Sequence, residues 1–267
     1  METIIDVNIT LGHWPLRRVP CDTPAALVAK LRSHDVIEAW VGSYNGLFHD
    51  DLTAVNNRLV QTCSSISNAD IRLRPFGAIN PLAANWETEL NRCTEKHRMS
   101  GIRVHPNYHG YALDHPNFAR LLNAAAERNL IVQLVVLMED ARMQHPLLRV
   151  PPVDLTPLAA LVSQIPSLKL VLLNALPTAS RGDKLNRLLD AGNVYVEIAM
   201  LEGIGGIENL IKDVPLERIL FGSHASSQYF ESAKLKLQES QLPAGHLNAI
   251  THENARRLLS PLPSGEG

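Results

Sequence analysis

Short apolar runs and longer amphipathic stretches alternate along almost the whole chain. The apolar runs are rich in Val, Ile and Leu, which is typical of strands buried on both faces. The pattern predicts eight strands, in chain order Ile4–Thr10, Ile37–Ser43, Ile71–Ile79, Gly101–His105, Leu130–Met138, Leu168–Leu173, Val194–Met200 and Arg218–Gly222.

A helix is predicted after each strand, because apolar residues recur there at helical spacing. Thr23 can cap the first of these helices, and Pro24 suits a first helical position. The predicted helices are Pro24–Ser33, Asp51–Ile66, Trp86–His97, Asn117–Arg128, Pro157–Ser163, Lys184–Ala191 and Ile207–Lys212, followed by two closing helices, Tyr229–Glu239 and Gly245–Leu259.

Strict alternation of strand and helix predicts an α/β fold with a parallel sheet. Eight such units within 267 residues favour a single-domain, closed (β/α)8 TIM barrel over residues 1–260. The alternative is a doubly wound sheet, which usually has a glycine-rich phosphate turn after its first strand; Leu11-Gly12-His13-Trp14 is not such a turn. Residues 261–267 are too polar and broken to pack, so we expect a flexible tail.

Composition excludes several classes of function. Lys and Arg number 25 against 27 Asp and Glu, without a long basic run, so we expect neither a nucleic acid nor a membrane surface as partner. No apolar run is long enough to cross a membrane. Three widely spaced cysteines and the lack of a secretory signal indicate a cytoplasmic protein without a disulfide framework. A small-molecule substrate is the expected partner, and homo-oligomerisation is left open.

Polar residues gather at the predicted strand ends, which open onto the active site in a β/α barrel. Asn8 and Thr10 are two apart on the first strand and therefore face the same side. The other candidates at strand ends or in the loops beyond them are Trp14, Arg17, Ser43, Asn45, Asn80, His105, Glu139, Asp140, Arg142, His145, Asn174, Glu197 and His224.

Each candidate also has a simpler structural explanation. Asn8 and Thr10 could only bond nearby backbone, and His224 could be a hydrogen-bonded core histidine. Loop arginines such as Arg17 and Arg142 are often solvated or salt-bridged. Trp14 could pack on the barrel rim, and a carboxylate as enclosed as Glu197 needs a cation or a raised pKa.

Three segments carry a resemblance to a known family. They are Ile219–His224 with the later Asn254–Leu259, Gly101–Pro106, and Leu168–Asn174. Together they resemble the amidohydrolase superfamily, in particular its amidohydrolase-related (amidohydrolase 2) branch, which holds carboxymuconate-semialdehyde decarboxylases and pyrone dicarboxylate lactonase. The resemblance runs from Ile4 to Leu259 and implies the barrel fold.

The resemblance also implies a divalent metal, typically zinc, but the matching positions differ. The family's first strand usually reads Asp-x-His-x-His, and its two histidines match Asn8 and Thr10. The family's sixth-strand histidine matches Asn174, and the aspartate of its Phe-Gly-Ser-Asp matches His224. Neutral amide and hydroxyl groups are poor zinc ligands, so we expect no metal centre and leave any cofactor unknown. A displaced centre of His105, His145 and His224 has no supporting ligand spacing.

These residues predict a hydrolase that acts, without the usual metal, on a small carboxylate-bearing lactone, amide or related molecule. His224 would activate water, Asn8 and Asn174 would bond the reacting carbonyl, and His105 would share their pocket. The expected substrate-binding residues are Thr10, Trp14, Arg17, Glu139, Arg142 and Glu197. The alternatives are a catalytically inactive barrel that binds a ligand or partner, and a decarboxylase.

Overall fold

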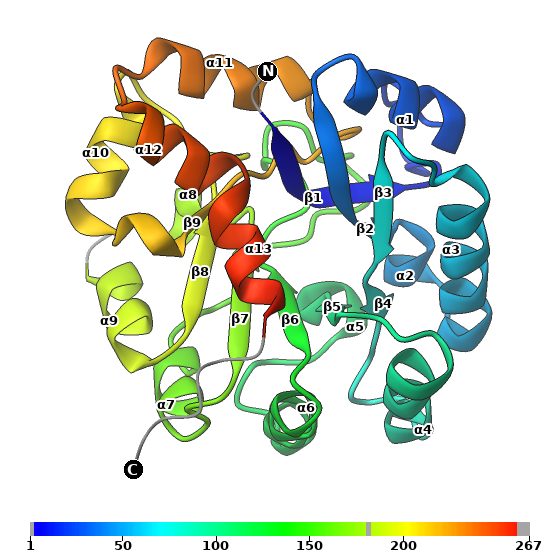
Figure 1. The fold of residues 1–267 in the computed structure, drawn as a ribbon. Coiled ribbons are helices and arrows are strands. Elements are labelled where there is room, and N and C mark those ends of the chain that lie inside the picture. The colour runs from blue at the N-terminus through cyan, green and yellow to red at the C-terminus, as the bar shows by residue number, and fades with distance from the viewer. Residues whose placement is uncertain (1–2, 180–182, 261–267) are drawn as a thin grey trace.

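Parallel strands form the centre of the fold, and helices surround them (Figure 1). The computed structural model describes residues 3–179 and 183–260, so the tail predicted for residues 261–267 lies outside the described residues. The strands are β1 (Ile4–Leu11), β2 (Val36–Ser43), β3 (Arg72–Pro75), β4 (Gly77–Ala78), β5 (Gly101–Val104), β6 (Ile131–Val135), β7 (Lys169–Leu173), β8 (Val194–Glu197) and β9 (Ile219–Leu220).

β3 and β4 are the two halves of one predicted strand, interrupted only at Phe76. The N–H of Phe76 still donates to the carbonyl of Val41, at 2.8 Å, so the chain continues alongside β2 through the interruption. All strand pairs are parallel, in the orders β1-β2-β3 and β4-β5-β6-β7-β8-β9. With β3 and β4 counted together, eight strands follow one another, as the sequence predicts.

Backbone hydrogen bonds between the first and last strands close the barrel. The N–H of Val7 donates to the carbonyl of Phe221 at 3.0 Å, and the N–H of Thr10 donates to the carbonyl of Ala225 at 3.3 Å. The predicted closed β/α barrel is therefore confirmed.

The long helices match the predicted ones within a few residues. They are α1 (Pro24–Arg32), α3 (Leu52–Ile66), α4 (Trp86–Asn91), α6 (Pro116–Glu127), α7 (Leu158–Ser163), α9 (Lys184–Ala191), α10 (Gly206–Asp213), α11 (Phe230–Glu239), α12 (Ala244–Asn248) and α13 (Asn254–Leu259), with π-helical turns at Arg92–Lys96 and Ala249–Glu253. The sequence did not predict α2 (Asn45–Phe48), α5 (Pro106–His109) and α8 (Leu176–Ala179), which are too short to show a helical period. Among the described residues, no helix is long and apolar enough to cross a membrane.

Apolar side chains fill the end of the barrel that α13 covers, opposite the C-terminal ends of the strands. Ile5, Ile131 and Val171 form one cluster with Ala255 and Leu258 of α13, which lies across the strand ends facing the viewer in Figure 1. This closed end leaves the opposite, C-terminal ends of the strands as the mouth. In a β/α barrel the mouth is where a site is expected.

We expect Gly42→Ala, on β2, to destabilise the fold. An added Cβ would lie 2.5 Å from Nη1 of Arg103, whose side chain is buried and held by hydrogen bonds, so it cannot easily move aside. Overpacking of this kind costs about 1–3 kcal/mol and should lower the melting temperature by several degrees.

Gly245→Ala is the matched control, because an added Cβ on this helical glycine meets nothing within 4 Å. Thermal unfolding followed by circular dichroism compares the two variants. Equal melting temperatures would show that the interior around Arg103 is not tightly packed.

Candidate active site at the mouth of the barrel

Three buried polar side chains, from three different strands, bond to one another just inside the mouth. Nδ2 of Asn8 on β1 donates to Oδ1 of Asn174 at 2.8 Å and to Oε1 of Glu197 at 3.2 Å. The backbone N–H of Asn174 also donates to that Oε1, at 2.6 Å, and Nδ2 of Asn174 donates to the carbonyl of Leu137 at 2.7 Å. We call Asn8, Asn174 and Glu197 the amide–carboxylate network.

Glu197 ends β8 and is 1 % exposed. Burial raises the pKa of its carboxyl, while backbone N–H donors lower it. Besides the bonds to Oε1, the N–H of Ala199 donates to Oε2 at 2.5 Å, so both oxygens are satisfied. A carboxylate this enclosed is tolerated because its lone pairs are occupied by N–H groups.

A buried arginine lies in the barrel interior, on β5. Arg103 on β5 donates from Nη1 to the carbonyl of Ile9 at 2.9 Å and to Oγ1 of Thr10 at 3.1 Å, and from Nε to Oε1 of Gln133 at 2.8 Å. Burial lowers the pKa of Arg103 to about 9, and the nearby Asp6 opposes that shift. Thr10 therefore faces the barrel interior, where its hydroxyl accepts a bond from Arg103; its predicted role in binding a substrate stays a prediction.

Sequence reasoning missed Asp6, Arg103 and Gln133 as parts of the barrel interior. Their signal was a charged or amide side chain in the middle of an otherwise apolar strand. Burial raises the pKa of Asp6 to about 6, and its Oδ1 accepts hydrogen bonds from the N–H groups of Asn8 and Ser223. These contacts tie β1 to the segment that carries His224.

His224 follows β9 and presents a neutral imidazole to a cavity. Its Nε2 lies 2.8 Å from the carbonyl of Met138, which can only accept, so Nε2 carries the proton. Burial lowers the pKa of His224 to about 4. At neutral pH Nδ1 therefore holds a free lone pair; the atom is buried from solvent and has no hydrogen-bond partner among the described residues.

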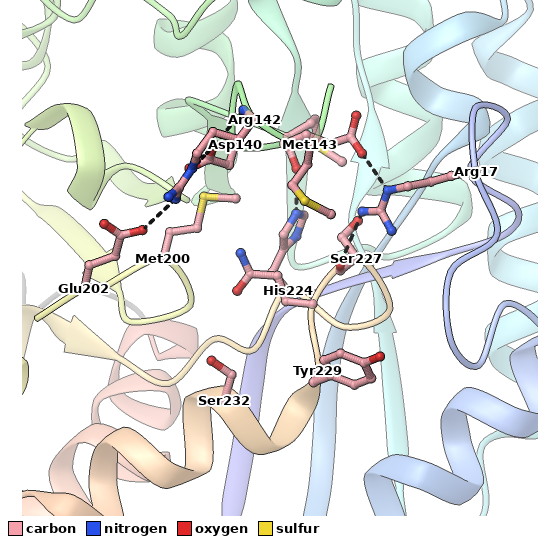
Figure 2. A pocket seen from close by; sticks show the side chains of 13 residues that line it. Arg17, Asp140, Arg142, Met143, Met200, Glu202, His224, Ser227, Tyr229 and Ser232 are labelled. Atoms are coloured by element: carbon pink, nitrogen blue, oxygen red, sulfur yellow. Dashed lines mark hydrogen bonds and ion pairs between the residues drawn. The ribbon is translucent and has the colours of Figure 1, made fainter. Parts of the chain in front are cut away.

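The cavity beside His224 has a volume of about 540 Å³ and is built by the loops after β1, β6, β8 and β9. Figure 2 shows Arg17 and Arg142 on opposite sides of His224, with Met143 and Met200 nearby. We call this space the His224 cavity. Its lining residues are Arg17, Met138, Glu139, Asp140, Arg142, Met143, Met200, Glu202, His224, Ser227, Gln228, Tyr229 and Ser232.

The two arginines of the cavity differ in how firmly they are held. Nε of Arg17 lies 3.1 Å from Oε1 of the buried Glu139, and Nη2 donates to the carbonyl of Ser227 at 3.4 Å. Burial raises the pKa of Glu139 and the Arg17 cation lowers it. Arg142 is 78 % exposed and binds Asp140 through two bonds of 2.9 Å, with Glu202 at 3.5 Å. Arg17 is therefore the better-ordered cation.

The structure gathers some of the predicted site residues and separates others. His224, Arg17, Glu139 and Arg142 line one cavity, whereas Asn8, Thr10, Asn174 and Glu197 are not among its lining residues and bond to other groups of the protein. Asn174 and His224 bond the successive carbonyls of Leu137 and Met138, so the network adjoins the base of the cavity.

Two further predicted residues lie outside the His224 cavity. His105 packs edge-on against His109 with ring centroids 5.7 Å apart, and burial lowers its pKa well below the ordinary value. Trp14 packs on Tyr44 and Phe48 at the rim, with centroids 5.3 and 5.6 Å away. Met138 and Met200 end two predicted strands but follow the observed ends of β6 and β8, and the cavity residues Met143 and Ser227 lie in loops, where no spacing rule could have marked them.

The fold and the position of the cavity define a β/α-barrel protein with a candidate site at its mouth. The sequence model of the family described as Amidohydrolase matches residues 16–260, and the chain belongs to this family, as its strand-end motifs predict. No curated protein sequence matches the chain significantly.

Solved structures with the same fold include several decarboxylases. The 2,6-dihydroxybenzoate decarboxylase from Rhizobium is 15 % identical, with a TM-score of 0.71 over 97 % of this chain and 99 % of that one. The 5-carboxyvanillate decarboxylase from Sphingomonas paucimobilis is 14 % identical, with a TM-score of 0.73 over 97 % of this chain and 99 % of that one. The dihydroxybenzoic acid decarboxylase from Polaromonas sp. is 16 % identical, with a TM-score of 0.71 over 97 % of both chains. Its structure was solved with manganese and 2-nitroresorcinol.

The residues at the mouth do not fit a divalent metal. The Asn174 amide oxygen accepts from Asn8, and the Asn8 amide hydrogens point at Asn174 and Glu197. Both Glu197 oxygens also accept backbone N–H groups. Within residues 3–179 and 183–260, no three His, Cys, Asp or Glu side chains gather as metal ligands would.

We expect the purified protein to hold well below one zinc or manganese ion per chain, because the amide–carboxylate network already uses the oxygens that would bind it. Elemental analysis measures the content directly, and dialysis against a chelator should leave the melting temperature unchanged. About one tightly bound ion per chain, or a large loss of stability after chelation, would contradict this reading of the mouth.

Proposed function

We propose that this chain is a hydrolase that binds a small carboxylate-bearing molecule in the His224 cavity and cleaves it without the family's usual metal. A lactone, amide or related acyl compound is the proposed substrate class. The observation that carries the proposal is the His224 imidazole, which borders the cavity with its Nε2–H fixed by Met138 and with a buried Nδ1 lone pair that has no partner among the described residues.

His224 is suited to take a proton from water once a side-chain movement exposes Nδ1, which is buried in this structure, to the cavity. As the oxygen of that water forms a bond to the acyl carbon, the proton moves to Nδ1 of His224. The bond from the acyl carbon to its leaving oxygen or nitrogen then breaks, and the leaving group takes the proton back. The carbonyl of Met138 fixes the tautomer, as the third member of a catalytic triad does.

Arg17 is proposed to hold the carboxylate of the substrate. Its guanidinium has a fixed orientation between Glu139 and Ser227, and an oriented guanidinium suits paired hydrogen bonds to a carboxylate. The methionines on the wall favour an apolar substrate body. The decarboxylases with the same fold act on, or bind analogues of, small aromatic carboxylates, which supports this ligand class.

Two other functions stay open. A binding protein without catalysis is supported by the amide–carboxylate network, because the Asn8 amide group donates to Asn174 and Glu197 and the Asn174 amide group donates to the carbonyl of Leu137. Decarboxylation is supported by the similar solved structures. It needs a proton delivered to carbon, however, and Nδ1 of His224 carries none at neutral pH. A cytoplasmic location also stays a prediction, consistent with the free thiols of Cys21, Cys63 and Cys93.

If a substrate is found in a panel of lactones and aryl amides, its hydrolysis should show the pH dependence of His224. Because burial lowers the pKa of His224 to about 4, the neutral form persists down to that pH. We expect kcat/KM to rise through about pH 4 and to stay level beyond pH 7. An acid limb near pH 6.5, the value of a free histidine, would indicate another base.

The same assay tests His224 directly. His224→Ala should lower kcat by about 10²–10⁴ while the melting temperature stays close to that of the parent protein. His13→Ala, which changes an exposed histidine in the loop after β1, is the matched control. Undiminished turnover by His224→Ala would exclude the proposed base. No turnover of any panel member by the parent protein, together with tight binding, would favour the binding-protein alternative.

We expect Arg17→Ala to weaken the binding of benzoate, the simplest aromatic carboxylate, by roughly 10–100-fold, the range of a charge-assisted hydrogen bond. Arg142→Ala should have a smaller effect, because Arg142 is exposed and already bound to Asp140. Titration followed by NMR compares the two variants. A greater loss in Arg142→Ala would place the carboxylate on the other side of His224.

A further inference from the structure

A second hollow opens at the mouth, over the ends of β2, β4 and β5. Its volume is about 490 Å³, within the range of small-molecule sites. Its walls come from α2, from the loop after β4 and from α5, and it shares no lining residue with the His224 cavity. It is lined by Leu47, Phe48, His49, Asp50, Leu52, Asn80, Leu82, Ala83, Tyr108 and His109, and we call it the Asn80 cavity.

A row of aromatic side chains runs between the two cavities. The hydroxyl of Tyr44 lies 2.6 Å from Oγ of Ser227, on the wall of the His224 cavity. From Tyr44 the row continues through Trp14 to Phe48 and Tyr108, with ring centroids 5.3, 5.6 and 5.7 Å apart. The row makes the two hollows separate compartments and holds Phe48 in place on the wall of the Asn80 cavity.

The Asn80 cavity exposes apolar surface that the fold does not use. Phe48 on α2 and Leu82 after β4 are each 42 % exposed, although both line a concave surface. A planar ring could cover both side chains and remove their apolar area from water.

Two polar groups of this cavity have unused hydrogen-bonding capacity. Nε2–H of His109 donates to the carbonyl of Gly46 at 2.8 Å, and its Nδ1, which has no partner among the described residues, is buried from solvent. Oδ1 of Asn80 accepts from the N–H of Leu82 at 2.9 Å, and its Nδ2 makes no hydrogen bond to a described residue. The cavity thus offers the amide donor of Asn80 to a ligand.

The charge of the lining determines the class of ligand. Asp50 is the one acidic residue among the lining residues, and none of them is Lys or Arg, so a carboxylate or phosphate would find no cation. We infer that the Asn80 cavity is a second small-molecule site, which takes an uncharged planar molecule with a carbonyl group. Its carbonyl would face Asn80, and its ring would lie along Phe48 and Leu82.

Benzamide and benzoate test this inference, because they share a shape and differ in charge and in the N–H donor. Both are titrated into the full-length protein and followed by NMR. We expect benzamide to perturb signals of Phe48, Leu82 and His109, and benzoate to perturb those of Arg17 and His224. Saturation with one ligand should leave the affinity for the other unchanged.

Two variants that change different walls of the Asn80 cavity test the inference separately, so that the result does not depend on a single substitution. Phe48→Ala and Leu82→Ser should each weaken benzamide binding, by roughly tenfold for the loss of the aromatic face, and leave benzoate binding unchanged. Arg17→Ala should weaken benzoate binding and leave benzamide binding unchanged. Melting temperatures confirm that the variants are folded.

The inference is overturned if benzamide does not bind, if both wall variants bind it as well as the parent protein, or if the two ligands compete. Failure of benzoate alone to bind would instead count against the carboxylate site of the proposed function. The two proposals therefore fail separately.

Discussion

The buried carboxylate of Glu197 is the constraint around which the mouth of this barrel is arranged. It accepts N–H groups from Asn8 on β1, from the backbone of Asn174 after β7 and from Ala199 after β8. A carboxylate without such donors would be costly to bury, and any donor lost would leave it partly unpaired. Glu197 therefore fixes three strand ends relative to one another.

These hydrogen bonds occupy the positions at which the family resemblance implies metal ligands. Where the family resemblance implies metal ligands, Asn8 and Asn174 bond each other, and the buried Arg103 bonds Thr10. His224 stands in place of an acidic ligand, and burial keeps it neutral. Catalysis in such a mouth would depend on a neutral base and on the cations of the loops.

The sequence predicted most of the fold because buried parallel strands are apolar throughout and are regularly followed by helices. It could not predict the interruption at Phe76 or the short helices after strand ends, which leave no periodic signal. It placed Asn8, Asn174 and Glu197 at the mouth but not in contact. Their contact depends on a closed barrel and on a register shift in β1 between Asp6 and Ile9, which only coordinates reveal.

The protonation of His224 tests the central claim of a neutral, oriented base most directly. In protein labelled with ¹⁵N-histidine, the ring nitrogens report which of them carries a proton. At pH 7 we predict that Nε2 of His224 is protonated, that Nδ1 is not, and that the Nδ1 signal shifts when benzoate is added. A doubly protonated ring, or a proton on Nδ1 instead of Nε2, would contradict the account.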